Sequence, residues 1–381
     1  MGILTSSFFS KAFFNRFKRV TSSGNFIAEI DGFRFYAIMT VLLLHMNTNF
    51  KRVFPFGIAH YNKSGLDKFL TLQGIGVDFF FIISGFILTL PLVNSFEKFS
   101  YKKFLIRRIT RLEPPFVICI LVLFCLQIAV GYLPFRDNVP HLLATLTYSH
   151  FLIYGVWSPI NPVTWSLETE FQFYLVAPLL AWLYFQKSGN YAVAAAIVSI
   201  LLLYFLDVLF NDQIAALHLS HSIVIYGGYF LSGILLAYLY KKKPGMFALS
   251  GRWNYLIPFP FLLIYCFHSE VYNVPLLQLC GLILLFISGF RAPILNKFFK
   301  NQFISSIGGM CYSIYLLHYS MIYILFALFA KFMVISSYGM MFLLFSFTLV
   351  IIIVAVAMFY LLFEKPFMKP GWYKLKSQPK T

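Results

Sequence analysis

Long apolar runs constrain this chain more than any other feature. An α-helix needs about 20 predominantly apolar residues to cross the hydrocarbon core of a bilayer, and runs of roughly that length recur along the sequence. Lipid offers no water to the backbone, so such runs are expected to fold as helices. Hydrophobic residues make up 60% of the 381 residues and charged residues only 11%, which excludes an ordinary soluble domain. The sequence predicts an all-α integral membrane protein with about ten transmembrane helices in one bundle.

The ten predicted spans follow one another with mostly short connections. They cover residues 33–50, 70–93, 114–133, 164–185, 191–210, 221–240, 253–269, 274–291, 304–330 and 339–363. The first and seventh spans are short and the third and fourth contain prolines, so nine or eleven crossings stay open. We expect one membrane domain over residues 28–368. A cytoplasmic, interfacial amphipathic segment over 1–27 would precede it, and a short cytoplasmic tail over 369–381 would follow.

The distribution of basic residues predicts the orientation of the spans. With a cytoplasmic N-terminus and ten crossings, the loops on that side hold 23 of the 30 Lys and Arg residues. The opposite orientation would place the clusters KFSYKKFLIRRITR and KKK (241–243) outside, against the positive-inside rule. The net charge of +17 is then explained by topology and by contact with anionic lipid. We expect the bilayer as a partner, no nucleic-acid partner, and both termini in the cytoplasm.

Two ionisable residues share the first predicted span. Arg34 and His45 are eleven residues apart, which is about 16 Å on an α-helix, or half a bilayer. Ionisable groups at such depth are costly and usually have a partner or a function. Asp78 in the second span and Glu170 in the fourth fall in the same outer-half layer as His45, where they would raise its basicity. His318 lies near the middle of the ninth span.

Each of these residues also has a purely structural interpretation. Asp78 would serve as a hydrogen-bonding anchor, and Glu170 would balance a nearby cation. His318 and His45 would be packing histidines with their hydrogen bonds satisfied. The sequence alone leaves both interpretations open.

Two arginines at the cytoplasmic start of the third span suggest an anion site. Arg108 and Arg111 lie three residues apart in RRITR, so a helix beginning there presents them on one face. Guanidinium groups bind phosphates well through forked hydrogen bonds. The alternative is a positive-inside stop signal that contacts lipid headgroups.

Six segments of the chain carry a resemblance to a known family. They are IDGFR with His45 eleven positions after Arg34, GVDFFFIISGF, FLIRRITRLEPPF, WSLETEFQFYLVAPLL, IGGMCYSIYLLH and YLLFEKPF. In this order, over roughly residues 28–368, the chain resembles the membrane acyltransferase-3 family of bacterial carbohydrate O-acyltransferases. The chain departs from the family where a second acidic residue often follows: here Phe171 follows Glu170, which leaves Glu170 as the matching carboxylate.

The resemblance implies an enzyme of the bacterial plasma (inner) membrane. It would move an acyl group, commonly acetyl, from cytoplasmic acyl-CoA to a hydroxyl of a cell-surface or lipid-linked glycan. The resemblance further implies that the donor's phosphates are held by Arg34, Arg108 and Arg111. The five cysteines show no metal-ligand spacing, and no metal is expected.

The resemblance also implies roles for residues deeper in the bundle. His45 would be the general base that takes the proton of the sugar hydroxyl as it attacks the thioester. Asp78 or Glu170 would orient the imidazole and stabilise its protonated form. Trp165 and His318 would bind substrate.

Two other functions remain open at this point. A transporter or flippase of a lipid-linked sugar would line its path with similar charges, but the chain shows no repeated halves. A glycan polymerase or ligase is expected to need a large outer loop, and the longest one predicted here, over 134–163, is modest.

Overall fold

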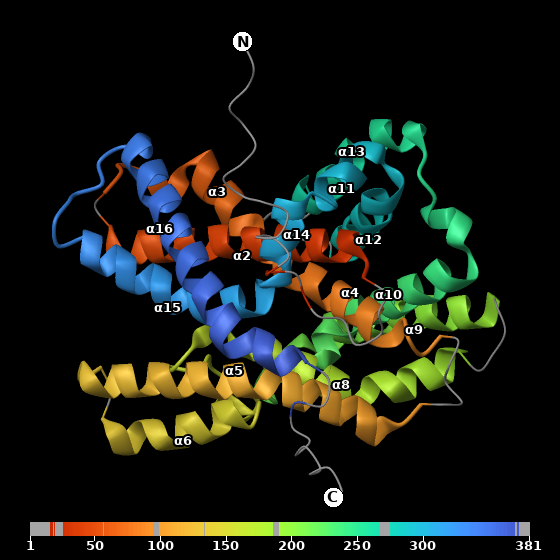
Figure 1. Cartoon of the computed structure of the whole chain (residues 1–381), viewed down its shortest axis with the longest axis horizontal. Coiled ribbons are helices and arrows are strands. Elements are labelled where there is room, and N and C mark those ends of the chain that lie inside the picture. Colours follow the sequence, from red (N-terminus) through yellow and green to blue (C-terminus); the bar gives the residue numbers. More distant parts are fainter. Residues whose placement is uncertain are drawn as a thin grey trace, which may run out of the picture.

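The computed structural model describes most of the chain. The described residues are 16–17, 19, 26–55, 57–93, 99–132, 134–185, 190–266, 275–369 and 372. The predicted interfacial segment 1–27 and the predicted tail 369–381 therefore lie almost wholly outside the described residues. Within the described ranges the chain is helical and contains no strand, which confirms the all-α prediction (Figure 1).

Most of the helices overlap the predicted spans. In the first half of the chain they are α2 (Ala28–Val53), α3 (Gly65–Thr71), α4 (Ile75–Thr89), α5 (Tyr101–Ala129), α6 (Phe135–Leu146), α7 (His150–Tyr154) and α8 (Trp165–Phe185). In the second half they are α9 (Asn190–Ala216), α10 (Ile223–Lys242), α11 (Pro258–Cys266), α12 (Pro275–Arg291), α13 (Pro293–Phe299), α14 (Gln302–Gly309), α15 (Cys311–Phe329) and α16 (Tyr338–Phe359). Helix α5 begins 13 residues before the third predicted span, and α6, α7 and α13 lie outside all of the predicted spans. Within the described residues, most of each predicted span lies on one helix or on consecutive helices.

The predicted number of ten crossings is not confirmed. Six helical segments in the described ranges are long and apolar enough to cross a membrane. A seventh is added if α12 and α13, which meet at a bend of 88°, form one broken span. The ninth predicted span is also interrupted, because α14 ends and α15 begins on either side of Met310. Helix α2 is not among the six, and polar residues such as Arg34, His45 and Asn47 lower its hydropathy.

Helix α2 is central to the packing. It lies across the middle of the molecule, where it contacts α4, α14 and α15 (Figure 1). The contact with α14 is close: a Cβ atom on Gly308 would lie 1.7 Å from the backbone oxygen of Asp31. Small residues permit such close backbone approach between membrane helices. The result is that Arg34 on α2 is buried beside the break between α14 and α15.

Helices α4 and α10 form a second close pair. A Cβ on Gly85 would lie 2.2 Å from the oxygen of Phe230, and a Cβ on Gly233 would lie 2.2 Å from the oxygen of Ile82. The two backbones therefore touch through glycine on both sides. Helix α8 packs against both α4 and α10, and it meets α4 where Glu170 of α8 accepts a hydrogen bond from Ser84 of α4.

Candidate functional site

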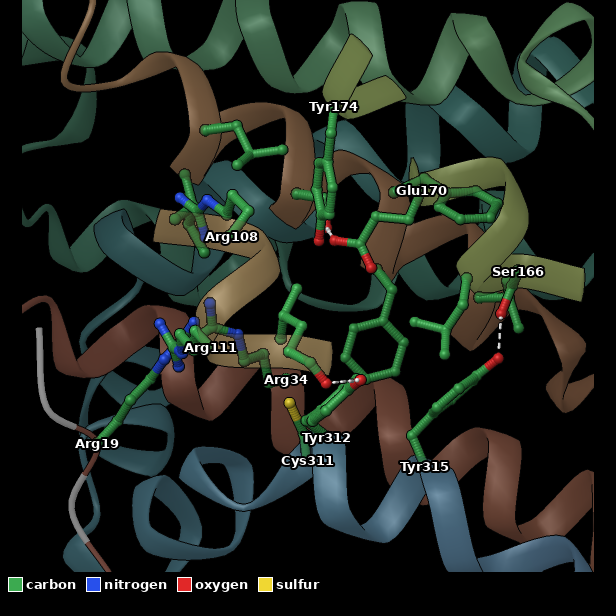
Figure 2. A pocket seen from close by; sticks show the side chains of 18 of the residues that line it. Arg19, Arg34, Arg108, Arg111, Ser166, Glu170, Tyr174, Cys311, Tyr312 and Tyr315 are labelled. Carbon is green, nitrogen blue, oxygen red and sulfur yellow. Dashed lines mark hydrogen bonds between the residues drawn. The ribbon is translucent and has the colours of Figure 1, made fainter. Parts of the chain in front are cut away.

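A pocket lies where α2, α4, α5, α8 and α15 come together (Figure 2). Its empty space, part of it open to solvent, is about 930 Å³. Apolar side chains of α2 and α4, among them Val41, Val77 and Phe80, contribute to its wall. The polar side chains of the lining are Arg19, Arg34, Ser84, Arg108, Arg111, Ser166, Glu170, Tyr174, Tyr312, Tyr315 and Glu364. A concave, largely apolar space with a few convergent polar groups is the usual form of a small-molecule site.

Four arginines from three segments line this pocket. Arg34 comes from α2, and Arg108 and Arg111 come from the first half of α5, so the structure brings the three predicted arginines to one place. Arg19, which precedes α2, joins them. Figure 2 shows Arg19, Arg108 and Arg111 grouped at one end of the pocket. Burial, followed by the neighbouring charges of Arg111 and Arg34, lowers the pKa of Arg19 to about 9, because both effects disfavour its charged form.

Most of this positive charge has no carboxylate at contact distance. Among the described residues, Arg34 alone of the four makes an ion pair, with Asp31 one turn earlier on α2. The Nε atom of Arg111 is buried and has no hydrogen-bond partner in the described part of the chain. Burying a charge without a partner is costly. The arginine end of the pocket is therefore suited to an anion that supplies the missing acceptors.

The two carboxylates of the pocket are occupied by neighbouring groups. Glu170 accepts a hydrogen bond from the Ser84 hydroxyl at 2.7 Å, and Tyr174 lies beside it (Figure 2). Glu364 accepts from the backbone N–H of Ser313 at 3.1 Å and from its hydroxyl at 2.5 Å. Both carboxylates are thus held in place, and each faces the arginines from a different helix.

His45 does not line the pocket but lies just beyond it. Its ring centroid is 5.1 Å from that of His318. Val41 and Tyr315, about one turn before these two histidines, do line the pocket. Tyr315, with its hydroxyl 2.8 Å from that of Ser166, lies at the end opposite the arginine group (Figure 2). The two histidines therefore lie beyond the end of the pocket that is opposite the arginines.

The structure does not bring the two predicted carboxylates to His45. Asp78 hydrogen-bonds to Tyr229 of α10, and Glu170 lies on the pocket with Ser84. Within the described ranges neither forms a hydrogen bond to His45. Counting residues along separate helices gives the depth of a side chain but not the direction in which it points.

Trp165 lies at the start of α8 in an aromatic cluster outside the pocket. Its ring centroid is 4.4 Å from that of His221 and 5.4 Å from that of Tyr226. Glu168, one turn later, accepts the backbone N–H of Phe151 at 2.9 Å and so anchors α7. Trp165 is next to the lining residue Ser166 in sequence but does not itself face the pocket.

Sequence reasoning misses several lining residues. Arg19 falls in the predicted interfacial segment because RFKRV has the composition of a lipid-contacting stretch. Tyr174 and Glu364 lie in segments that carry the family resemblance, WSLETEFQFYLVAPLL and YLLFEKPF, and that resemblance is the signal that could have found them. The described residues contain no group of three His, Cys, Asp or Glu side chains able to hold a metal ion, and the absence of a metal stays a prediction.

Comparisons with known proteins agree with the motif pattern. The profile of a family described as "Acyltransferase domain" matches residues 27–362. The peptidoglycan O-acetyltransferase OatA of Listeria monocytogenes is 26% identical over 339 residues, which are 80% of this chain and 51% of the relative. YrhL of Bacillus subtilis, provisionally named a peptidoglycan O-acetyltransferase, is 30% identical over 201 residues, or 48% and 28% of the two chains. A Staphylococcus aureus protein provisionally named an O-acetyltransferase, SACOL0978, is 23% identical over 351 residues, or 81% and 52%.

The chain spans about half the length of the Listeria and Staphylococcus relatives. No solved structure matches it. The family profile nevertheless covers most of the chain, from before α2 to the end of the last long helix. The protein is a multi-pass membrane protein that belongs to the acyltransferase-3 family, as the order of its sequence motifs predicts.

Proposed function

We propose that this protein is a membrane-embedded O-acetyltransferase. It moves an acetyl group from acyl-CoA, which enters from the cytoplasm, to a hydroxyl of a cell-surface glycan. The observation that carries the proposal is the shape of the site: arginines largely without carboxylate partners at one end of the pocket, and a histidine pair beyond the other. Membership of the acyltransferase-3 family supports the same reaction.

The arginine end suits the anionic part of the donor. Coenzyme A carries phosphates, and Arg34, Arg108, Arg111 and Arg19 present guanidinium groups to one space. Forked guanidinium–phosphate hydrogen bonds are strong and directional. The unpartnered Nε of Arg111 is the kind of buried donor that such a phosphate would satisfy.

His45 is proposed to act as the general base. A sugar hydroxyl is a weak nucleophile until its proton is removed during attack on the thioester carbonyl. In the proposed reaction His45 takes that proton, the new C–O bond forms as the C–S bond breaks, and the protonated imidazole returns the proton to the departing thiolate. The free thiol and the acetylated glycan leave, and His45 is neutral again.

The nature of the acceptor is taken from the relatives. Two of them carry peptidoglycan O-acetyltransferase in their names, so peptidoglycan is the first acceptor to test, and a lipid-linked glycan the second. The positive-inside distribution of Lys and Arg supports a bacterial plasma-membrane location with the donor side facing the cytoplasm.

The test is acetyl incorporation by membranes that contain equal amounts of each variant. Labelled acetyl-CoA is supplied on the cytoplasmic side, and acetate released by mild base from peptidoglycan is counted. We expect His45→Ala to lower turnover by about 10² to 10⁴-fold, the usual contribution of a general base. His60→Asn is the matched control, because His60 is exposed in a turn and absent from the pocket lining. Full activity of His45→Ala, or transport of a lipid-linked sugar without acetylation, contradicts the proposal.

A further inference from the structure

The contact between His45 and His318 gives His45 a neighbour that the sequence does not assign to it. His45 is on α2 and His318 is on α15, and their rings are 5.1 Å apart between centroids and tilted by 46°. His318 is fully buried. The only other ring contact of His45 among the described residues is with Tyr319, at 5.1 Å in an edge geometry. The imidazole of His45 therefore packs against two adjacent rings of α15, one of which is an imidazole.

The backbone determines which nitrogen of His318 carries the proton. Its Nδ1 lies 3.0 Å from the carbonyl oxygen of Ile314 and 2.8 Å from that of Tyr315. Both partners are acceptors only, so Nδ1 must be the donor. In the neutral ring Nε2 is then left with a lone pair. This Nε2 atom is buried and has no hydrogen-bond partner in the described part of the chain.

A second histidine pair in the same chain shows what this separation permits. His141 and His150 also have ring centroids 5.1 Å apart, with a tilt of 35°. Their facing nitrogens are 2.9 Å apart, which is hydrogen-bonding distance. A ring separation of 5.1 Å is therefore compatible with an imidazole–imidazole hydrogen bond. The rings of His45 and His318 have the same separation, at a tilt of 46°.

We infer that His318 is the positioning residue for His45, an inference that rests on the proposed function. Its Nε2 accepts the N–H of His45, which leaves the other nitrogen of His45 free to take the proton of the acceptor hydroxyl. This is the task that a carboxylate performs in many hydrolases. Asp78 and Glu170 form no hydrogen bond to His45 within the described residues; Asp78 interacts with Tyr229 and Glu170 accepts from Ser84.

The test compares two amide replacements of His318. In His318→Gln the amide lies near the position of Nε2 and supplies an oxygen acceptor there. In His318→Asn the shorter amide lies near Nδ1 and supplies none. We expect kcat for acetyl transfer to fall on the order of 10- to 100-fold in His318→Asn, the usual effect of losing a hydrogen bond to a charged group. His318→Gln should recover most of it, and KM for the donor should stay unchanged in both.

The pH profile separates positioning from simple packing. Without an acceptor the protonated form of His45 loses stabilisation, so the acid limb of kcat/KM should move to lower pH in His318→Asn and stay near wild type in His318→Gln. Binding of coenzyme A to each purified variant shows that the site is folded. If His318→Asn and His318→Gln have the same kcat and the same acid limb of kcat/KM, the inference is wrong. His45→Ala is assayed in parallel. If it keeps its activity, His45 is not the base and the proposed function is wrong. If it is inactive while both His318 variants keep wild-type kcat, only the positioning role of His318 is wrong.

Discussion

At the scale of single residues, the feature that most favours an anion site is inward-facing positive charge that is largely without carboxylates at contact distance. Arg19, Arg108 and Arg111 make no ion pair with the described residues, although they line a pocket inside an apolar bundle. Lipid headgroups would explain basic residues at a helix end, but these side chains point into a shared pocket (Figure 2). Their arrangement fits an anionic ligand better than it fits a surface contact.

The arginine cluster leads to a prediction on donor binding. Replacing Arg108 and Arg111 together with Gln should weaken coenzyme A binding by at least about 10-fold, since a hydrogen bond to a charged group contributes roughly 1.5–3 kcal/mol. Arg107→Gln is the matched control: Arg107 is adjacent in sequence but exposed and absent from the lining. Isothermal titration with coenzyme A measures the affinities. If the double variant binds as tightly as Arg107→Gln, the two arginines serve only topology or lipid contact.

At the scale of elements, close glycine contacts decide how the helices meet. The α4–α10 pair touches backbone to backbone through Gly85 and Gly233, and no hydrophobic pattern along either helix shows this. Such packing is sensitive to a single added carbon, because a backbone atom cannot move aside as a flexible side chain can.

Gly233→Ala should therefore destabilise the bundle. Its Cβ would lie 2.2 Å from the oxygen of Ile82, so the two helices must separate. Overpacking of this kind costs typically 1–3 kcal/mol. Gly228→Ala on the same helix is the control, because its Cβ would meet only a methyl carbon of Ile200 at 3.8 Å. Thermal unfolding in detergent should give a lower midpoint for Gly233→Ala than for Gly228→Ala, and equal midpoints would argue against the close contact.

The His141–His150 pair links α6 and α7 and predicts a pH dependence of stability. Burial, followed by the neighbouring His141, lowers the pKa of His150 to about 4 from 6.5. The unfolded chain therefore binds a proton more readily than the folded one between these values. The contribution of neutral His150 to stability should be complete above pH 6.5 and lost as the pH falls toward 4. The check is to measure thermal unfolding midpoints of wild type and of His150→Gln from about pH 7.5 to 4.5. The midpoint should fall less over this range in the variant than in wild type. Parallel curves would contradict the prediction.

At the scale of the whole molecule, the membrane topology remains the largest open prediction. The structure contains six or seven segments that pass as spans by length and hydropathy, whereas the sequence predicts ten with both termini in the cytoplasm. The difference concerns α2, α8 and α11, which lie on predicted spans but are not among these segments. Several of these helices carry or enclose the site, so the count bears on where the pocket opens.

Epitope tags at residues 1 and 381 test the orientation. Both tags should be protected from an external protease in intact cells and cleaved once the membrane is permeabilised, because the basic loops favour the cytoplasmic side. A tag inserted between residues 57 and 64, in the first predicted outer loop, should show the reverse. A C-terminal tag cleaved in intact cells would mean an odd number of crossings or the opposite orientation.

Part of the site follows from spacing along the chain and part does not. Arg34 and His45 lie on one helix, as their spacing predicts, and Arg108 and Arg111 share the pocket with Arg34. The contact between His45 and His318 does not follow from the sequence, since the ninth span is broken at Met310 and a depth count through it carries no information on rotation. The place of Arg19 in the pocket does not follow either, because nothing in a basic, aromatic stretch distinguishes a side chain that faces lipid from one that turns inward.

The sequence by itself determined the class of the fold and the family, because both depend on features that lie along the chain: the length of apolar runs and the order of short motifs. Only the tertiary structure decided which side chains meet. Each helix can rotate about its axis without changing its hydrophobic length, and here close glycine contacts of α2 with α14 and of α4 with α10 select one rotation. In the resulting arrangement Glu170 lines the pocket with the arginines, Asp78 lies against Tyr229, and His318 is the neighbour of His45.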